Sequence, residues 1–215
     1  KKKRIPLVVD LGSGTIISTD NYNLPEEKNI QAISNTGADI ITFSGDKLIG
    51  GPQCGFIIGK KRYINKISQN PLHRTYRCDK WTIAFMEETL KTFQSEKKFD
   101  SNNLSLKLLT TSRRELIVRG KRIIEKIPKS KVKVLGLTLE ESFVEAGSGS
   151  LPLKSIPSAV LKFRPKEISI SSLAKAFRLG KQPVVGYTKG NVFYIDLKAV
   201  LPSQISQLIA SIKKV

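Results

Sequence analysis

Three short apolar segments, each next to a glycine-containing turn, are the feature of the first third of this 215-residue chain that most constrains its fold. They are IPLVVD (5–10), DIITFS (39–44) and CGFIIGK (54–60), and the stretch 24–35 has the features of a short helix closed near Gly37. Apolar runs of this length between turn residues are typical of strands. The order strand, helix, strand, turn, strand predicts one part of an α/β domain.

From residue 61 onward the pattern becomes helical. Residues 61–67 predict a short helix, and residues 79–93 predict a long amphipathic one because Ile83, Met86, Leu90 and Phe93 recur at spacings of three and four. The polar stretch 96–103 is the expected domain boundary. After it we expect helices within 105–127, strands at 131–142 and 158–165, a helix at 170–180, a hairpin at 184–197 and a final helix at 201–215.

This order predicts an α/β first part and an α+β second part with an antiparallel sheet. The expected domains are residues 1–66, the C-terminal part of a large domain, residues 67–102, an interdomain helix and linker, and residues 103–215, a small domain. The charge is uneven, because residues 1–100 contain 16 Lys and Arg against 11 Asp and Glu, and residues 101–215 contain 21 against 7. A field of this sign attracts polyanions, first of all nucleic acid, although a solvated basic face has the same composition.

Other features exclude some classes of protein and site. No segment approaches the roughly 18 consecutive apolar residues of a membrane span, so no membrane partner is expected. The two cysteines, Cys54 and Cys78, form no CxxC pair, so neither a disulfide framework nor a metal site is predicted, and a reducing cytoplasm is the expected location.

Lys47 follows the second apolar segment, in the stretch FSGDKLIGGPQ, with Asp46 before it and two glycines shortly after. A desolvated lysine amine loses its proton more readily and can condense with an aldehyde cofactor, of which pyridoxal phosphate is the usual one. The ring nitrogen of that cofactor requires a carboxylate partner, and Asp10, at the end of the preceding strand, fits that role. The plainer alternative is that Asp10 caps a turn and Lys47 is exposed.

The stretch ADIITFSGDKLIGGPQCGFIIGKK resembles the pyridoxal-lysine segment of bacterial selenocysteine synthase, the L-seryl-tRNA(Sec) selenium transferase family. The resemblance is collinear over nearly the whole chain. It continues in VVDLGSG, NPLHRTYRCDKWTIAFMEETL, EAGSGSLP, IPSAVLKF and PVVGYTKGNVFYIDLKAVL. It implies part of a pyridoxal-phosphate fold-type-I large domain, of the kind found in aspartate aminotransferase, followed by a small α+β C-terminal domain.

The resemblance also implies roles for individual residues. Lys47 would form the Schiff base with pyridoxal 5′-phosphate, Asp10 would pair with the ring nitrogen, and Asp46 would act in proton transfer at the serine hydroxyl. Arg74 and Arg77 would bind selenophosphate, and their three-residue spacing places them on one face if the segment is helical. The alternative is that they are two surface arginines of a basic protein.

The reaction implied by the resemblance is a β-replacement that converts seryl-tRNA(Sec) to selenocysteinyl-tRNA(Sec), with no metal. Cys54 and Cys78 stand where small residues are expected, and we interpret them as small buried groups. We expect the chain to be the C-terminal half of a longer enzyme that forms homo-oligomers, and to be inactive without the N-terminal half. The alternatives are another fold-type-I lyase and a non-catalytic basic tRNA-binding fragment.

Overall fold

The computed structural model describes residues 5–22, 24, 26–94, 103–146 and 155–215, and it divides into two compact units. Unit 1 contains residues 1–110 and 145–155, and unit 2 contains residues 111–144 and 156–215. The finer division into residues 1–66, 67–102 and 103–215 stays a prediction. The boundary stretch 96–103 and the loop 147–152 lie outside the described residues, except for Asn103.

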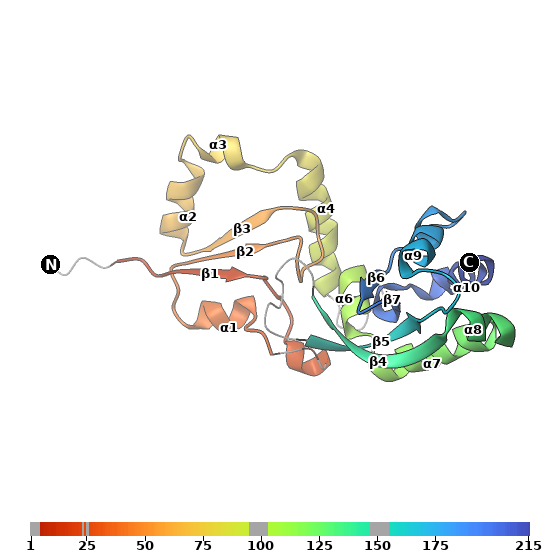
Figure 1. Ribbon diagram of the computed structural model, residues 1–215. Helices are drawn as coiled ribbons and strands as arrows, with labels where there is room; N and C mark the ends of the chain where they lie inside the picture. Colours follow the sequence, from red (N-terminus) through yellow and green to blue (C-terminus); the bar gives the residue numbers. More distant parts are fainter. Residues whose placement is uncertain (1–4, 23, 25, 95–102, 147–154) are drawn as a thin grey trace. The chain divides into compact units, whose positions relative to one another are not determined.

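Unit 1 is a three-stranded sheet with helices packed against it (Figure 1). The strand order is β1-β2-β3, in which β1 and β2 are parallel and β2 and β3 are antiparallel. Its elements are β1 (Val8–Gly12), η1 (Thr19–Tyr22), α1 (Ile30–Asn35), β2 (Ile40–Ser44), β3 (Gly55–Gly59), α2 (Lys61–Ser68), α3 (His73–Tyr76), α4 (Lys80–Lys91), η2 (Thr92–Gln94) and α6 (Leu104–Thr110). All three strands predicted for this part of the chain are confirmed.

One face of this sheet is buried and the other is open. The buried face carries alternate residues of β2, Ile41 and Phe43, which belong to one apolar cluster with Ile33 of α1 and Met86 of α4. The alternation follows from the pleat of a strand, whose successive side chains point to opposite faces. On the other face, Val8 is 55% exposed within the part of the chain that the structure describes. The residues of β2 on this other face, such as Ile40 and Thr42, are half-buried.

Two helices of unit 1 differ from their predicted extents. The predicted helix at 24–35 begins only at Ile30, because the Asn29 side chain caps it by accepting a hydrogen bond from the Ala32 amide at 2.7 Å. The helix predicted over 79–93 is α4, which begins at Lys80 because Asp79 is its N-cap, and which ends at Lys91. Of the residues predicted for its apolar face, Met86 is buried but Ile83 is 58% exposed.

A buried carboxylate joins the beginning of β2 to its neighbours. Asp39 is 3% exposed, and its Oδ2 accepts a hydrogen bond from the Leu7 amide at 2.9 Å. Its Oδ1 lies 2.7 Å from Nζ of Lys60, at the end of β3. A buried charge requires such partners, so this ion pair fixes where the three strands begin and end relative to one another.

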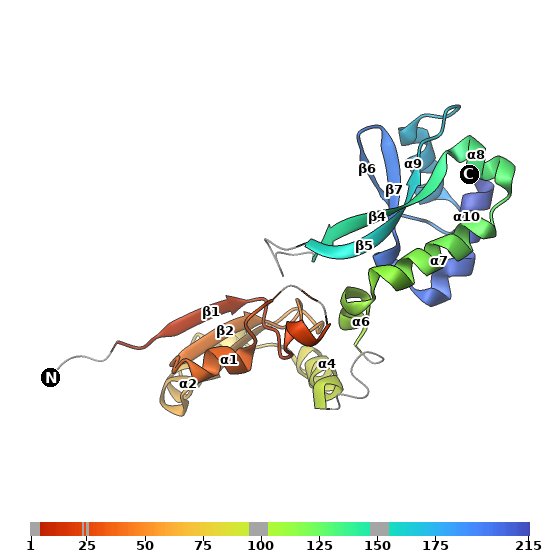
Figure 2. The same cartoon turned by 90° about the horizontal axis from the view of Figure 1, so that it is seen from below.

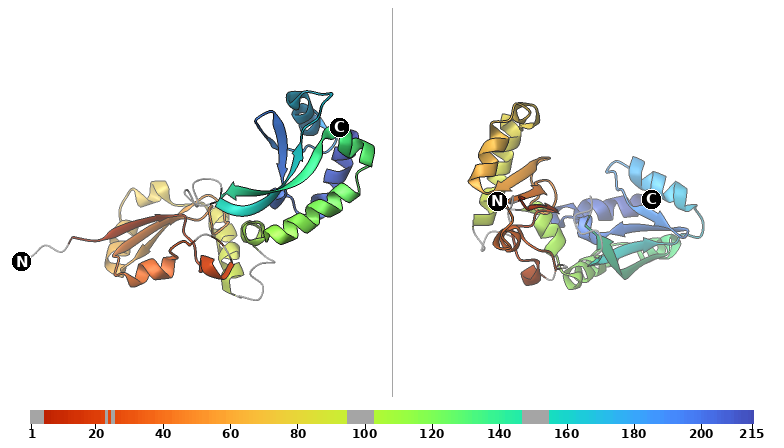
Figure 3. Two further views of the ribbon diagram at one scale, coloured as in Figure 1. Left: turned by 60° about the horizontal axis from the view of Figure 1, so that its bottom comes forward. Right: turned by 90° about the vertical axis from the view of Figure 1, so that its left-hand side faces the viewer.

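Unit 2 is a four-stranded sheet of order β4-β5-β7-β6, with helices packed around it (Figures 2 and 3). The pairs β5–β7 and β7–β6 are antiparallel. Its elements are α7 (Arg113–Glu125), α8 (Lys129–Leu135), β4 (Leu137–Glu145), β5 (Ser155–Phe163), α9 (Ile170–Leu179), β6 (Tyr187–Lys189), β7 (Val192–Asp196), η4 (Leu197–Ala199), η5 (Pro202–Gln204) and α10 (Ile205–Lys214).

The core of unit 2 is built around three packed phenylalanines. Phe163 of β5, Phe177 of α9 and Phe193 of β7 have ring centroids 5.3–5.9 Å apart and are at most 2% exposed. Helices α7 and α10 contribute to the same cluster, for example through Leu116 and Ile212. An aromatic cluster of this size is a large part of the apolar area that stabilises a small domain.

The strand predicted at 131–142 is half wrong. Its first part is the helix α8, which begins after Pro128 and ends at Gly136, whose φ of +53° terminates a helix without strain in a residue that lacks a Cβ. The hairpin predicted around Lys189, Gly190 and Asn191 is confirmed. Gly190 and Asn191 have φ values of +56° and +57°, which is the type I′ turn that a two-residue hairpin favours.

Candidate functional site

Lys47 lies in the turn that follows β2, at the carboxyl end of that strand. The turn is closed by hydrogen bonds from the Gly50 amide to the Lys47 carbonyl (3.0 Å) and from the Gly51 amide to the Gly45 carbonyl (2.9 Å). Lys47 itself is half-buried, next to the fully buried Ile49. Among the described residues, its ammonium has no hydrogen bond or ion pair. The alternative of a fully exposed lysine is therefore wrong.

The glycines of this turn are required by packing. A Cβ on Gly45 or Gly51 would lie 2.4 Å from the Cε atom of Met86 in α4. A Cβ on Gly50 would lie 2.8 Å from the hydroxyl of Ser105, and the φ of Gly50 is +76°. A methyl group at any of these positions would require Met86 or Ser105 to shift, because real Cβ atoms do not approach other atoms so closely. The turn that carries Lys47 is therefore packed closely against α4 and α6.

Asp10 lies near the carboxyl end of β1, directly opposite Thr42 of β2. Its Oδ1 accepts hydrogen bonds from the Thr42 hydroxyl (3.1 Å) and from the Gly12 amide (3.2 Å). Asp10 therefore does cap the following turn, as the plainer alternative required, and it is also held by the neighbouring strand. Its side chain is exposed on the open face of the sheet.

Asp10 and Lys47 come from neighbouring parallel strands, and both lie at the carboxyl ends of those strands. In α/β sheets, ligands bind outside the carboxyl ends of the strands. The exposed carboxylate of Asp10 suits the ring nitrogen of pyridoxal phosphate, and the half-buried amine of Lys47 suits its aldehyde. These two residues therefore fit pyridoxal phosphate.

Arg74 and Arg77 lie at α3, which Figure 1 shows next to α2, on the side of β3 away from β1. Arg74 is in the single turn of this helix, and Arg77 is its C-cap, whose amide donates to the His73 carbonyl at 3.0 Å. Arg74 is thus helical, whereas Arg77 has an extended backbone, so the helical condition of the prediction is met at Arg74 only. Both are exposed, and neither guanidinium has a hydrogen bond or ion pair among the described residues. They are not brought together with Asp10, which lies at the other edge of the sheet.

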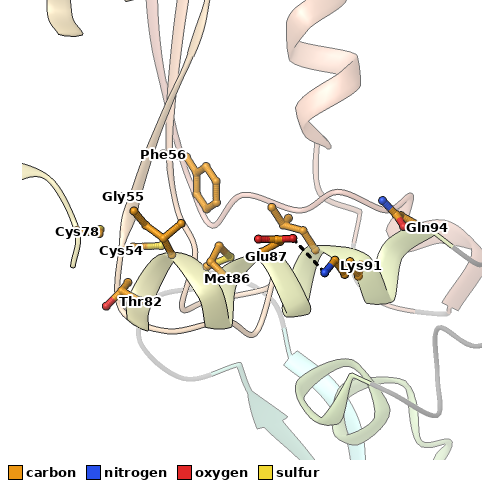
Figure 4. A pocket seen from close by; sticks show the side chains of 11 residues that line it. Cys54, Gly55, Phe56, Cys78, Thr82, Met86, Glu87, Lys91 and Gln94 are labelled. Carbon is orange, nitrogen blue, oxygen red and sulfur yellow. Dashed lines mark ion pairs between the residues drawn. The ribbon is translucent and has the colours of Figure 1, made fainter. Parts of the chain in front are cut away.

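A groove of about 520 Å³ lies between β3 and α4 (Figure 4). Its walls are mainly apolar and include Phe56, Met86 and Leu90. Cys54 and Cys78, 24 residues apart in the sequence, both line it and are half-buried. Burial raises the pKa of the Cys54 thiol, and the nearby negative charges of Cys78 and Asp46 raise it further.

The structure adds residues that the sequence analysis did not identify. Thr42 orients Asp10, and Asn103 holds the Lys47 turn through a 2.9 Å hydrogen bond from its Nδ2 to the Ile49 carbonyl. Asn103 also accepts from the Leu106 amide at 3.1 Å, and an asparagine directly before a helical run is a recognisable capping signal. The bond from Asn103 to Ile49 has no such signal, because the two residues are 54 positions apart.

Three comparisons place these features among known proteins. The family model described as "SelA: L-seryl-tRNA selenium transferase" matches residues 1–201. The L-seryl-tRNA(Sec) selenium transferase of Alkaliphilus oremlandii is 37% identical over 215 residues, which are 100% of this chain and 46% of that protein. The protein of the same name from Carboxydothermus hydrogenoformans is 37% identical over 205 residues, 95% of this chain and 44% of that protein.

The chain thus spans about half the length of the curated relatives it matches. A solved structure of D-glucosaminate-6-phosphate ammonia-lyase matches with a TM-score of 0.58 and 18% identity, over 98% of this chain and 48% of that one. The predicted fold class is confirmed: an α/β part of a fold-type-I large domain is followed by a small α+β domain. Within the described residues, no helix is both long and apolar enough to cross a membrane.

Proposed function

Because the chain belongs to the L-seryl-tRNA selenium transferase family, we propose that it is part of an enzyme that converts seryl-tRNA(Sec) to selenocysteinyl-tRNA(Sec). We propose pyridoxal phosphate as its cofactor and selenophosphate as its selenium donor. The observation that carries the proposal is the position of Asp10 and Lys47 at the carboxyl ends of two neighbouring parallel strands, within a family match that covers residues 1–201.

The cofactor, when bound, supplies an aldehyde and an electron-withdrawing ring. In the proposal, Lys47 holds that aldehyde through its amine, and Asp10 faces the ring nitrogen and keeps it protonated. Thr42 supports this role, because its hydroxyl donates to Asp10 Oδ1 and fixes the orientation of the carboxylate. The hydrogen bonds and glycine contacts of the turn give Lys47 a fixed position, which a reacting amine requires.

Asp46 precedes Lys47 in the same turn and is half-buried. We propose that Asp46 donates a proton to the seryl hydroxyl, so that this group leaves as water. Arg74 and Arg77 would bind the selenophosphate anion, because two guanidinium groups at α3 can each donate to its oxygens. Their exposure and their freedom from other ion pairs among the described residues support this assignment.

The charge of unit 2 suits the tRNA substrate. Its residues 111–144 and 156–215 contain 19 Lys and Arg against 6 Asp and Glu. Such an excess attracts the phosphate backbone of a nucleic acid in a salt-dependent way. We propose that the enzyme acts in the cytoplasm, where charged tRNA is available, and that it forms homo-oligomers.

Borohydride reduction of the chain in the presence of pyridoxal phosphate tests the central assignment. Reduction makes even a weakly populated adduct permanent, so a peptide map is expected to place the label on Lys47 in preference to other lysines. Lys47→Ala should lose this label. Lys66→Ala is the matched control, because Lys66 is an exposed lysine of the same unit, in α2, without an ion pair among the described residues.

A label spread evenly over exposed lysines, or concentrated on another lysine, would contradict the assignment of Lys47. Formation of selenocysteinyl-tRNA from seryl-tRNA and selenophosphate, measured in the protein that contains this chain, tests the reaction. Release of a keto acid from a free amino acid instead would indicate another fold-type-I lyase. Salt-dependent tRNA binding without any preferred label at Lys47 would favour a non-catalytic basic fragment.

A further inference from the structure

The groove between β3 and α4 brings together the two cysteines of the chain (Figure 4). Cys54 precedes β3, and Cys78 precedes α4, so they come from two different segments. Figure 4 shows both at the end of the groove where α4 begins, near Thr82. The fold therefore places the two thiols at the same end of one apolar groove, where a molecule that enters the groove can meet both.

Three observations indicate that the two sulfur atoms can react with each other. Both thiols are free and half-buried, so each remains accessible. Both thiols line the same end of the groove, and the negative charge of an ionised Cys78 is among the causes that raise the pKa of Cys54. Neither residue lies within a helix or a strand, so the hydrogen bonds of a regular element do not restrain either position.

We propose that Cys54 and Cys78 form a reversible intramolecular disulfide when a peroxide enters this groove. Cys78 releases its proton, its thiolate attacks one oxygen of hydrogen peroxide, and the O–O bond breaks. A sulfenic acid forms on Cys78, and the other oxygen leaves as hydroxide, which takes up the released proton and becomes water. The thiol of Cys54 then attacks that sulfur, the S–S bond forms, and a second water leaves. The two thiols are oxidised by two electrons and the peroxide is reduced by two.

The order of the two thiols follows from their surroundings. Burial and negative neighbours disfavour the thiolate of Cys54, and the thiolate is the form that attacks a peroxide. Cys78 therefore reacts first and Cys54 resolves the sulfenic acid.

The disulfide would connect the two parts of the proposed site. The carbonyl of Cys54 accepts a 2.9 Å hydrogen bond from the amide of Gly45, in the turn that carries Lys47. Cys78 directly follows Arg77. The bond would tie the segment after α3 to that turn and close one end of the groove. This consequence rests on the proposed function, whereas formation of the disulfide does not.

The test is to treat the folded 215-residue chain with hydrogen peroxide, alkylate the remaining free thiols and map the peptides by mass spectrometry. The expected result is a Cys54–Cys78 linked peptide within single chains, loss of both free thiols, and recovery of both thiols on reduction. The same treatment in urea should give less of this link, because the fold no longer holds the two thiols together.

Alanine variants separate the two roles. Cys54→Ala should leave a sulfenic acid on Cys78, which dimedone detects, and Cys78→Ala should leave Cys54 as a free thiol. Phenylarsine oxide, which requires two adjacent thiols, gives a second readout and should bind the reduced native chain but neither variant. Two alkylated thiols after peroxide treatment, links only between different chains, or equal linking in urea would each overturn the proposal. None of these outcomes depends on pyridoxal phosphate or tRNA.

Discussion

The side-chain amide of Asn103 donates a 2.9 Å hydrogen bond to the main-chain carbonyl of Ile49, although 54 residues separate them. Both residues are buried, with exposures of 5% and 0%. The other end of the same side chain caps α6 by accepting from the Leu106 amide. One asparagine thus anchors the turn that carries Lys47 to a helix that follows it much later in the sequence.

The first prediction concerns this anchor. Asn103→Asp keeps the oxygen that caps α6 but replaces the donor with an acceptor, so the Ile49 carbonyl is left buried without its partner. We expect the free energy of unfolding of unit 1 to fall by about 1–3 kcal/mol, the cost of an unsatisfied buried polar group. Native-state hydrogen exchange of the β2 amides measures it.

Asn29→Asp is the matched control for this change. Asn29 caps α1 with the same oxygen, but its hydrogen bond is exposed and its amide nitrogen donates no hydrogen bond among the described residues. Aspartate and asparagine are about equally good at this position, so the control should be close to neutral. Equal effects of the two changes would show that the bond to Ile49 contributes nothing to stability.

The second prediction compares two glycines with positive φ. Gly50 has a φ of +76°, and a Cβ there would lie 2.8 Å from Ser105 Oγ, whereas Gly37 has a φ of +86° and nothing within 4 Å of such a Cβ. Alanine at either position should cost about 1–2 kcal/mol of stability for the left-handed backbone alone. We expect Gly50→Ala to cost roughly a further 1 kcal/mol or more, because its methyl group also meets α6.

Urea unfolding of the two alanine variants, followed through hydrogen exchange in unit 1, gives this difference directly. Equal destabilisation would mean that the turn can move away from α6 at little cost. The contact between Gly50 and Ser105 would then not hold the turn that carries Lys47 in place.

The third prediction is a pH dependence. Lys198 is 6% exposed and donates a 2.9 Å hydrogen bond to the Thr111 carbonyl. Burial lowers its pKa, and the positive charge of Arg113 lowers it further, while Asp196 opposes the shift. The folded state therefore releases this proton at a lower pH than the unfolded state does. Between the lowered pKa and the ordinary value of 10.5, the unfolded state binds more protons, so stability should rise with pH.

Lys198→Met should remove this rise, because it leaves no group to titrate at that position. Lys175→Met, which changes an exposed lysine of α9, should retain the rise. Chemical unfolding of unit 2 at several alkaline pH values compares the slopes. Parallel slopes for the chain and its Lys198→Met variant would argue against a depressed pKa at Lys198.

The fourth prediction concerns the proposed anion site. Arg74→Ala and Arg77→Ala should each weaken the use of selenophosphate in selenium transfer by about 1.5–3 kcal/mol, the usual contribution of a hydrogen bond to a charged group. Borohydride labelling of Lys47 should be unchanged, since α3 lies away from Asp10. Lys66→Ala, which removes one positive charge from the exposed surface of α2, is the control. An unchanged dependence on selenophosphate in the double variant would show that these arginines do not bind the donor.

Much of the local structure could be predicted because its signals are local. The three strands of unit 1, the hairpin at Gly190 and Asn191 and the helix capped by Asp79 follow from apolar runs, turn residues and capping residues. The prediction failed at 131–135, where alternating lysine and valine suggested a strand. There the packing of Leu135 into the core of unit 2 and the left-handed Gly136 produce a helix instead.

By itself, the sequence determined which residue types stand at the ends of β1 and β2, and therefore that a carboxylate and a lysine were available for one site. Only the tertiary structure decided which partners these and other polar groups find. The bonds from Thr42 to Asp10 and from Asn103 to Ile49, and the shared groove of Cys54 and Cys78, join residues far apart in the chain. Such contacts depend on strand register and on the packing of whole elements. The spacing of apolar residues in one segment predicts which face a residue occupies, but it does not predict which residue of another segment lies opposite.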